Sequence, residues 1–246
     1  MDTGKQLTFM GHLDELRRRL MVSVIAVGVC TIVSFPFVGY VIKILESRAE
    51  GIQFIYIEMT EMIGVYMKVG LVCGVALAMP VVLYQVVMFL SPGLTRREKG
   101  YLYSFLPGAM VAFACGVLFA FFVLIPPAAR FLITFGSDIA TPQIRVSNFV
   151  SLMLTLLFWV GVSFESPLLI LILSKLGIVS PEALSRKRRW AIVGAFVLGA
   201  IITPTFDPIN QSLVAIPLIV LYEVGIILAR IARRREKLVG APARVA

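Results

Sequence analysis

Two glutamates lie inside long apolar stretches, where an ionisable side chain needs a specific reason to be present. Glu165, in the segment Phe164-Glu165-Ser166-Pro167, lies about nine residues from one end of its apolar run, roughly 14 Å deep at 1.5 Å per residue. A charge at mid-membrane costs roughly 2.5 to 3.5 kcal/mol, so such residues normally face a bundle interior or a water-filled cavity. Because no Lys or Arg lies inside the apolar runs, Glu165 must be either protonated or reached by water.

These two states of Glu165 correspond to different roles. A protonated, hydrogen-bonded Glu165 would be structural, whereas a hydrated one would be a titratable group on a transport path. Pro167 removes the donor for the carbonyl of Ser163, which adds a second polar group near the carboxyl. Glu223 is shallower, about six residues from the end of its run, and either snorkels toward the interface or makes a buried polar contact.

A second pair of glutamates, Glu15 and Glu98, lies in charged segments between the apolar runs. A planar guanidinium pairs bidentately with a carboxylate, so carboxylates on one membrane face are suited to an arginine-containing peptide. Both glutamates also have arginine neighbours in the sequence, so the alternative is ordinary ion pairing within interfacial helices. The residue types alone leave both interpretations open.

The sequence lacks the common patterns of hydrolytic and metal-dependent enzymes. It has no His-Glu-x-x-His pair, no Gly-x-Ser-x-Gly elbow and no pair of aspartates within the apolar runs. Cys30, Cys73 and Cys115 lie in separate apolar runs without metal-ligand spacing, and the single histidine, His12, precedes them all. We therefore expect free, buried thiols, no enzyme activity, no metal and no cofactor.

The elements that must position these glutamates are membrane-spanning helices. Hydrophobic residues make up 59% and charged residues 15% of the 246 positions, and the mean hydropathy is +0.94. An ordinary soluble domain is about a quarter charged. The charges here are gathered between long apolar runs, as in helices joined by loops. Since no soluble basic domain fits between these runs, the net charge of +9 indicates membrane topology and no nucleic-acid binding.

Six apolar segments are predicted to span the membrane, since crossing requires about 20 apolar residues. The fifth is short, and a turn-forming stretch at 203–208 separates it from the sixth. We expect an all-α integral membrane protein with a single membrane domain over residues 1–246 and a basic cytoplasmic tail at 230–246. The predicted spans cover residues 20–38, 69–90, 101–125, 149–173, 190–205 and 209–229.

Positive charges predict the orientation of these spans. With six spans, eighteen of the 23 Lys and Arg residues fall on the side that holds both termini. The positive-inside rule makes this side cytoplasmic, so we expect a multi-pass protein of the cytoplasmic (inner) membrane with both termini inside. The loop at 39–67 is long enough for short helices, and the spacing of Phe9, Leu13, Leu16 and Leu20 predicts an interfacial amphipathic helix before the first span.

Five motifs occur along the chain in an informative order. They are His12-Leu13-Asp14-Glu15-Leu16-Arg17; Phe89-Leu90-Ser91-Pro92-Gly93-Leu94 followed by Arg96-Arg97-Glu98; Phe164-Glu165-Ser166-Pro167; Thr203-Pro204 with Asp207 and Gln211; and Tyr222-Glu223. In this order, and in its six-span topology, the chain resembles the TatC family, the signal-peptide receptor subunit of the twin-arginine translocase. The resemblance covers nearly the whole chain, from Phe9 to Ala229.

This resemblance implies a binding site for twin-arginine signal peptides on the cytoplasmic face. Glu15 and Glu98 match family positions that recognise the arginine pair, and Arg17, Leu16 and Phe89 belong to the same matched motifs. The receptor would nucleate assembly of the export complex for folded proteins. It would associate with further copies of itself and draw energy from the proton gradient.

The resemblance also implies small single-span partners of the TatA and TatB type within the lipid bilayer. We expect the outer ends of spans five and six to dock such a partner, with Thr203, Asp207 and Gln211 as polar contacts, because helices in lipid need packing and hydrogen bonds to associate. The alternative function is an ion- or proton-coupled small-solute transporter that uses Glu165. Transporters of that class often carry internal repeats, and none is visible here.

Overall fold

The structure, a computed structural model, describes residues 9–48, 54–90, 96–134, 143–175, 177–203 and 208–239. Helices account for nearly all of these residues. The chain divides into two compact units, the first formed by residues 1–110 and 143–154 and the second by residues 111–142 and 155–246. The single membrane domain expected over residues 1–246, with its basic tail at 230–246, stays a prediction.

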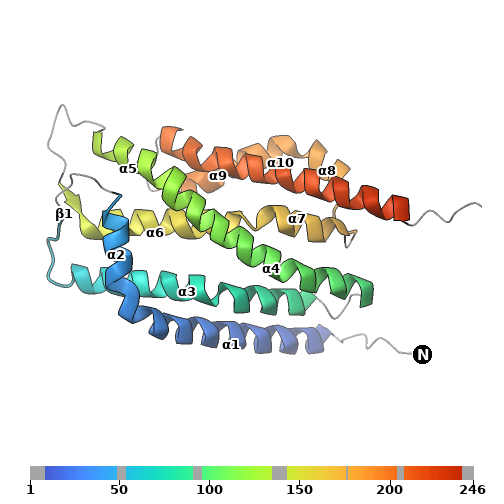
Figure 1. The fold of residues 1–246 in the computed structure, drawn as a ribbon, viewed down its shortest axis with the longest axis horizontal. Helices are drawn as coiled ribbons and strands as arrows, with labels where there is room; N and C mark the ends of the chain where they lie inside the picture. The colour runs from blue at the N-terminus through green and yellow to red at the C-terminus, as the bar shows by residue number, and fades with distance from the viewer. Residues whose placement is uncertain are drawn as a thin grey trace, which may run out of the picture. The chain divides into compact units, whose positions relative to one another are not determined.

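The first unit is built on two long helices, α1 (Phe9–Ser34) and α3 (Glu61–Leu90), which lie side by side in Figure 1. Helix α1 runs without a break through the predicted interfacial helix into the first span. It ends at Ser34 because Pro36 has no backbone N–H with which to continue the helical hydrogen bonds. The short helix η1 (Phe35–Phe37) then connects it to α2 (Val38–Glu46). Close packing holds the pair, since a Cβ on Gly74 would clash with the backbone of Thr31.

A small parallel pairing at one end of the first unit was not predicted from the sequence. Strand β1 (Phe54–Ile55) pairs with β2 (Ile144–Arg145), with Phe54 opposite Ile144 and Ile55 opposite Arg145. Helix α6 (Val146–Ser163) begins directly after β2. Two-residue strands carry too little alternation to be recognised by periodicity.

Two helices that begin in the first unit and continue into the second are interrupted. Helix α4 (Arg96–Phe119) passes through the π-helical turn η3 (Ala120–Leu124) into α5 (Ile125–Thr134). The turn falls where two consecutive prolines, Pro126 and Pro127, remove backbone donors. In the fourth span, α6 ends at Ser163 and α7 (Ser166–Lys175) begins after a break of two residues.

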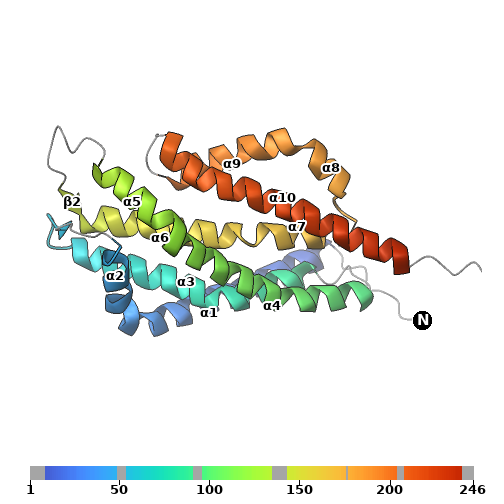
Figure 2. The ribbon, with the colours of Figure 1, turned by 45° about the horizontal axis from the view of Figure 1, so that its top comes forward.

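The remaining helices of the second unit are α8 (Pro181–Arg186), α9 (Arg188–Ile202) and α10 (Pro208–Val239). Helix α10 packs against α7 and α9, as Figure 2 shows. Glycines allow close approach within this unit, because a Cβ on Gly161 would lie 2.9 Å from side-chain atoms of Phe113 and Val117. A small core of buried residues includes Ala120, Leu124 and Val160.

Five stretches in the described residues are long and apolar enough to cross a membrane: Leu13–Glu46, Glu61–Val86, Leu106–Leu132, Val146–Lys175 and Gln211–Arg233. They correspond to predicted spans one to four and six. Helix α9 has 15 residues, so it is about 22 Å long at 1.5 Å per residue, short of the roughly 30 Å hydrocarbon core. The total of six spans therefore stays a prediction.

The three cysteines are free, as expected, but not all of them are buried. Cys30 and Cys73 are half-buried, whereas Cys115 is exposed on α4. An apolar run in a membrane helix packs only part of its circumference against other helices, and the rest faces lipid. The expectation that Cys115 is buried within the protein was therefore wrong.

Candidate functional site

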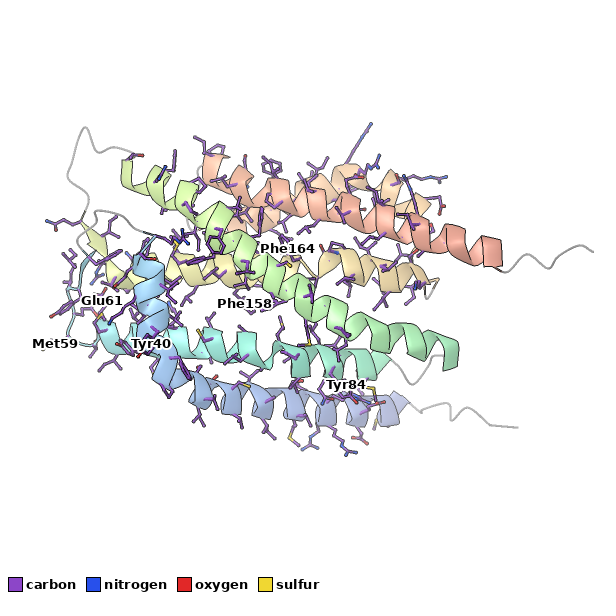
Figure 3. The ribbon with its side chains drawn as sticks, viewed as in Figure 1. Tyr40, Met59, Glu61, Tyr84, Phe158 and Phe164 are labelled. Atoms are coloured by element: carbon purple, nitrogen blue, oxygen red, sulfur yellow. The ribbon has the colours of Figure 1, made fainter. Side chains whose placement is uncertain are left out.

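A groove of about 630 Å³ lies between α1 and α3 in the first unit. Its residues on α1 recur every three or four positions and therefore share one helical face. Two acidic and two basic side chains line it together. Figure 3 labels Tyr84, one of the two contributions from α3. The lining residues are Gly11, Asp14, Glu15, Arg18, Arg19, Val22, Tyr84 and Gln85.

Glu15, the predicted receptor carboxylate, lies in this groove and is held by Arg19. The Nε of Arg19 donates to Oε1 of Glu15 at 2.9 Å, and Nη2 of the same guanidinium contacts the same oxygen. Arg19 also reaches across to α3, where its Nη1 donates to Oε1 of Gln85 at 3.4 Å. The side chains of Arg19 and Glu15 are only 20% and 21% exposed. The local ion pair that the sequence left open as an alternative is thus formed, with Arg19 as the partner.

The other residues predicted for the peptide site are placed differently. Leu16 and Arg17 are exposed on α1 but are not among the residues that line the groove. Phe89 is half-buried near the end of α3. Glu98 lies in the first turn of α4, and its side chain is outside the part of the chain that the structure describes. The predicted pairing of Glu15 with Glu98 in one site therefore stays a prediction.

Glu165 lies in the two-residue break between α6 and α7. Its carbonyl accepts from the backbone N–H of Leu169 at 2.9 Å, so Glu165 starts the first turn of α7, where the helix dipole favours negative charge. The side chain is half-buried. Its Oε1 is buried and has no hydrogen-bond partner among the described residues. A buried carboxylate oxygen without a partner is unfavourable, so it marks a position where a proton or a polar partner would add stability.

The ring of Phe164, beside Glu165, closes this break against α4. The centroids of Phe164 and Phe119 are 5.4 Å apart. A Cβ on Gly116 would lie 2.8 Å from Cβ of Phe164, so only glycine admits this ring. Figure 3 labels Phe164 at the junction. Glu165 is therefore anchored between tightly packed helices and not on a loose loop.

Glu223 makes an ion pair that sequence analysis missed. The Nε of Arg188 lies 2.7 Å from its Oε1, and Nη2 donates to its Oε2 at 2.8 Å, which is the two-point geometry of a guanidinium on a carboxylate. Arg188 begins α9, in a basic cluster that the sequence analysis used only for topology. Both side chains are partly exposed, so this contact is not a buried one, and the position of Glu223 at the interface stays a prediction.

Further contacts tie α8 to α10 around this pair. The hydroxyl of Tyr222 donates to the carbonyl of Leu184 at 2.9 Å. Arg233 donates to Glu182 at 2.6 Å. These partners lie far apart in the sequence, so no local pattern could have revealed them.

The residues predicted to dock a partner are engaged within the second unit. Thr203 is buried, and its hydroxyl donates to the carbonyl of Gly199 at 2.7 Å. The amide of Gln211 donates to the carbonyl of Phe196 at 2.7 Å, which joins the start of α10 to α9. Asp207 lies outside the described residues. The structure thus brings Thr203 and Gln211 to the same helix pair, where the Thr203 hydroxyl and one N–H of the Gln211 amide donate within the unit.

Comparisons with known proteins agree with the resemblance seen in the motifs. The family model for Sec-independent protein translocase protein (TatC) matches residues 11–217. A TatC protein from Carboxydothermus hydrogenoformans is 36% identical over 234 residues, which cover 94% of this chain and 96% of that protein. Another from Aquifex aeolicus is 38% identical over 232 residues, covering 92% and 96%.

A solved structure shows the same fold. The crystal structure of a twin-arginine translocase receptor, TatC, superposes with a TM-score of 0.82 at 38% sequence identity, and the match covers 91% of this chain and all of that one, 100%. The predicted all-α membrane fold is confirmed by this match and by the apolar helices described above.

Proposed function

This chain belongs to the TatC family, a membrane component of a protein translocase and not an enzyme, and we propose that it is the receptor for twin-arginine signal peptides. It would bind these peptides at its cytoplasmic face in the inner membrane and nucleate assembly of the export complex. The alternative of a small-solute transporter built on Glu165 is set aside, because the family carries proteins across the membrane.

The observation that carries this proposal is the contact between Glu15 and Arg19. It places a guanidinium against the Glu15 carboxylate inside an open groove, which is the chemistry that a signal-peptide arginine requires. The groove also holds Asp14 and Gln85, whose oxygens can accept from a second donor group. Arginine is favoured over lysine here because its planar fork can bond to the carboxylate and to a neighbouring acceptor at once.

Binding of a peptide arginine at Glu15 would be an exchange of one guanidinium for another. A partly exposed pair four residues apart on a helix contributes only about 0.3 to 0.5 kcal/mol. A charge-assisted hydrogen bond from a well-placed ligand contributes roughly 1.5 to 3 kcal/mol. The incoming arginine can therefore displace Arg19, which retains Gln85 as a partner on α3.

Glu98 would bind the other arginine of the pair. Glu98 follows the α3–α4 connection, and Glu15 lies on α1 at the end of the α1–α3 pair where α3 finishes. Leu16 is exposed and apolar, and Phe89 is half-buried, so both offer surface to the hydrophobic region that follows the arginines in a signal peptide. Arg17 is exposed on α1 outside the groove lining and would repel stray cations near it.

A single-span partner of the TatA or TatB type would dock along α9 and the start of α10. An exposed apolar stripe on α9, formed by Val193, Val197 and Ile201 at four-residue spacing, supports this part of the proposal. The shortness of α9 would also thin the bilayer locally. Thr203, Asp207 and Gln211 would fix the polar end of this surface.

The proposed receptor function is tested by peptide affinity. Purified full-length protein should bind an Arg-Arg signal peptide more tightly than its Lys-Lys version. Glu15→Ala and Glu98→Ala should each weaken Arg-Arg binding about tenfold, since each removes one charge-assisted contact. Glu223→Ala is the matched control, because it removes a carboxylate that lies on α10 and pairs with Arg188. Equal affinities for the two peptides in the unmodified protein would refute the proposal.

A further inference from the structure

A second polar cavity, of about 280 Å³, lies in the first unit at the end where β1 meets β2. We call it the strand-end pocket. It is remote along α3 from the Glu15 groove, as the positions of Glu61 and Tyr84 in Figure 3 show. The pocket is lined by Glu58, Glu61, Gly64, Val65, Lys68, Arg145, Ser147, Val150 and Ser151.

One carboxylate of the pocket is fully engaged in holding the fold. The side chain of Glu61 is only 5% exposed. Its Oε1 accepts from the Ser147 hydroxyl at 2.6 Å, and its Oε2 accepts from the backbone N–H of Ile57 at 3.0 Å. Nη2 of Arg145 lies 3.6 Å from the same Oε2. Glu61 is thus a structural anchor between the β1 segment and α6, and is not available to a ligand.

Lys68 is in a different position. Glu61 is the first residue of the apolar stretch on α3. Lys68 follows it by seven residues and therefore lies about 10 Å farther along the helix. Its Nζ carries three donors, and among the described residues it donates to a neutral group, the Ser151 hydroxyl, at 2.8 Å. That hydroxyl in turn donates to the carbonyl of Ser147 at 2.5 Å. A lysine at the end of a membrane helix is best placed where an anionic or strongly polar group receives its charge.

The other charges of the pocket favour a ligand that carries both a positive and a negative charge. Glu58 is 70% exposed, and its Oε1 lies 3.4 Å from Nη2 of Arg145. The Nε of Arg145 is buried and has no hydrogen-bond partner among the described residues. Two acidic and two basic side chains sum to no formal charge, so the pocket does not select a net anion or a net cation.

An apolar surface adjoins the pocket on α3. Ile63, Met67 and Leu71 are all exposed and recur at four-residue spacing, so they form one stripe. Ile63 and Met67 directly precede Gly64 and Lys68, which line the pocket, so the stripe runs beside it along the helix. An amphipathic ligand could therefore place its polar group in the pocket and its hydrocarbon on this stripe.

We propose that the strand-end pocket binds the headgroup of a zwitterionic phospholipid that carries a primary ammonium, such as phosphatidylethanolamine. The phosphate accepts from Nζ of Lys68 and from Arg145, the ammonium donates to Glu58, and the acyl chains lie along Ile63, Met67 and Leu71. The cavity, of about 280 Å³, has room for a phosphoethanolamine group of about eight non-hydrogen atoms. An anionic headgroup such as phosphatidylglycerol would bring no cation to Glu58, and a choline headgroup has no N–H to donate to it.

The proposal is tested by native mass spectrometry of the full-length protein with lipids of matched acyl chains. Phosphatidylethanolamine should bind more tightly than phosphatidylglycerol or phosphatidylcholine. Lys68→Gln should weaken its binding about tenfold, because a charge-assisted contact to phosphate is lost while an amide can still bond to Ser151. Lys43→Gln is the matched control, since Lys43 is an exposed lysine on α2 in the same unit that does not line the pocket.

Glu58→Gln supplies a second test that does not threaten folding, because Glu58 is largely exposed. It should reduce binding of phosphatidylethanolamine to the level of phosphatidylcholine and leave phosphatidylcholine unchanged. Free phosphoethanolamine should compete with the lipid, whereas inorganic phosphate should compete poorly. Equal lipid binding by Lys68→Gln and Lys43→Gln, a preference for phosphatidylglycerol, or full competition by inorganic phosphate would each overturn the proposal.

Discussion

Among single residues, Arg19 has the clearest effect on how the proposed peptide site works. Its guanidinium occupies Glu15 in the unbound protein, so every peptide must displace it. An internal competitor lowers the affinity of all ligands for that carboxylate by one common factor. A preference for arginine over lysine must therefore come from the geometry with which the peptide side chain contacts Glu15, and not from its competition with Arg19.

We predict that Arg19→Gln tightens binding of Arg-Arg and Lys-Lys peptides by the same factor, about twofold, because a pair of this kind contributes about 0.3 to 0.5 kcal/mol. Isothermal titration with both peptides measures this. Arg18→Gln is the control, since Arg18 also lines the groove and carries the same charge but is one position away from the Glu15 contact. Weaker Arg-Arg binding in Arg19→Gln would instead identify Arg19 as a residue that positions Glu15.

Glu165 is expected to serve transport and not peptide binding, because its buried Oε1 lies in the helix break without a partner among the described residues. Glu165→Gln should change the free energy of unfolding by about 1 kcal/mol or less and leave peptide affinity unchanged, yet slow export. Glu165→Ala should slow it further. The export rate is measured with a folded precursor and vesicles, and the free energy of unfolding is measured by thermal unfolding. Failure of a thiol at position 165 to react with any water-soluble reagent would favour a structural role.

At the scale of elements, prolines and glycines determine where the helices end and how closely they pack. The apolar runs predicted six spans because lipid leaves backbone groups no partner except the helix itself, and the described helices include stretches long enough to cross for spans one to four and six. The exact interruptions did not follow from those runs. The π-helical turn before Pro126 and the break before Pro167 depend on which neighbouring helix packs there, as Gly116 against Phe164 illustrates.

The docking surface for a single-span partner is expected on the exposed side of α9 and α10. Leu213 packs against the core around Val160, whereas Ile201 and Ile216 are exposed. Cysteines at positions 201 and 216 should therefore form disulfides with cysteines in the partner helix. Leu169→Cys, exposed on α7, is the control position. Crosslinks that form equally well at position 169 would count against this surface.

For the whole molecule, the number of membrane crossings depends on α9, because this helix is shorter than a full span. We predict six crossings with both termini in the cytoplasm, as the positive charges require. In a background without native cysteines, Arg186→Cys should react only from the cytoplasmic side. Ala140→Cys and Phe206→Cys should react only from the opposite side. Labelling of position 206 from the cytoplasm would mean that α9 does not cross, and labelling of position 140 from there would refute the orientation.

The polar contacts show what sequence reasoning could and could not reach. Glu15, Glu165 and Glu223 stand out in the sequence as unusual charges, because a carboxylate near or within an apolar run can be recognised without the fold. Their partners cannot, because they are set by folding. Glu223 lies 35 residues from Arg188, and Glu61 lies 86 residues from Ser147, so each pair exists only once distant helices have packed.

The link between α8 and α10 has a consequence for the order in which the protein is made. Glu182 pairs with Arg233, which follows it by 51 residues, and ribosomes add about 5 to 20 residues per second. Roughly 3 to 10 s of synthesis therefore separate the two partners. Arg188, Leu184 and Glu182 must all remain in solvent, or in temporary contacts, until the last helix has left the ribosome. Helix α8 is consequently among the last elements of the nascent chain to reach its mature environment.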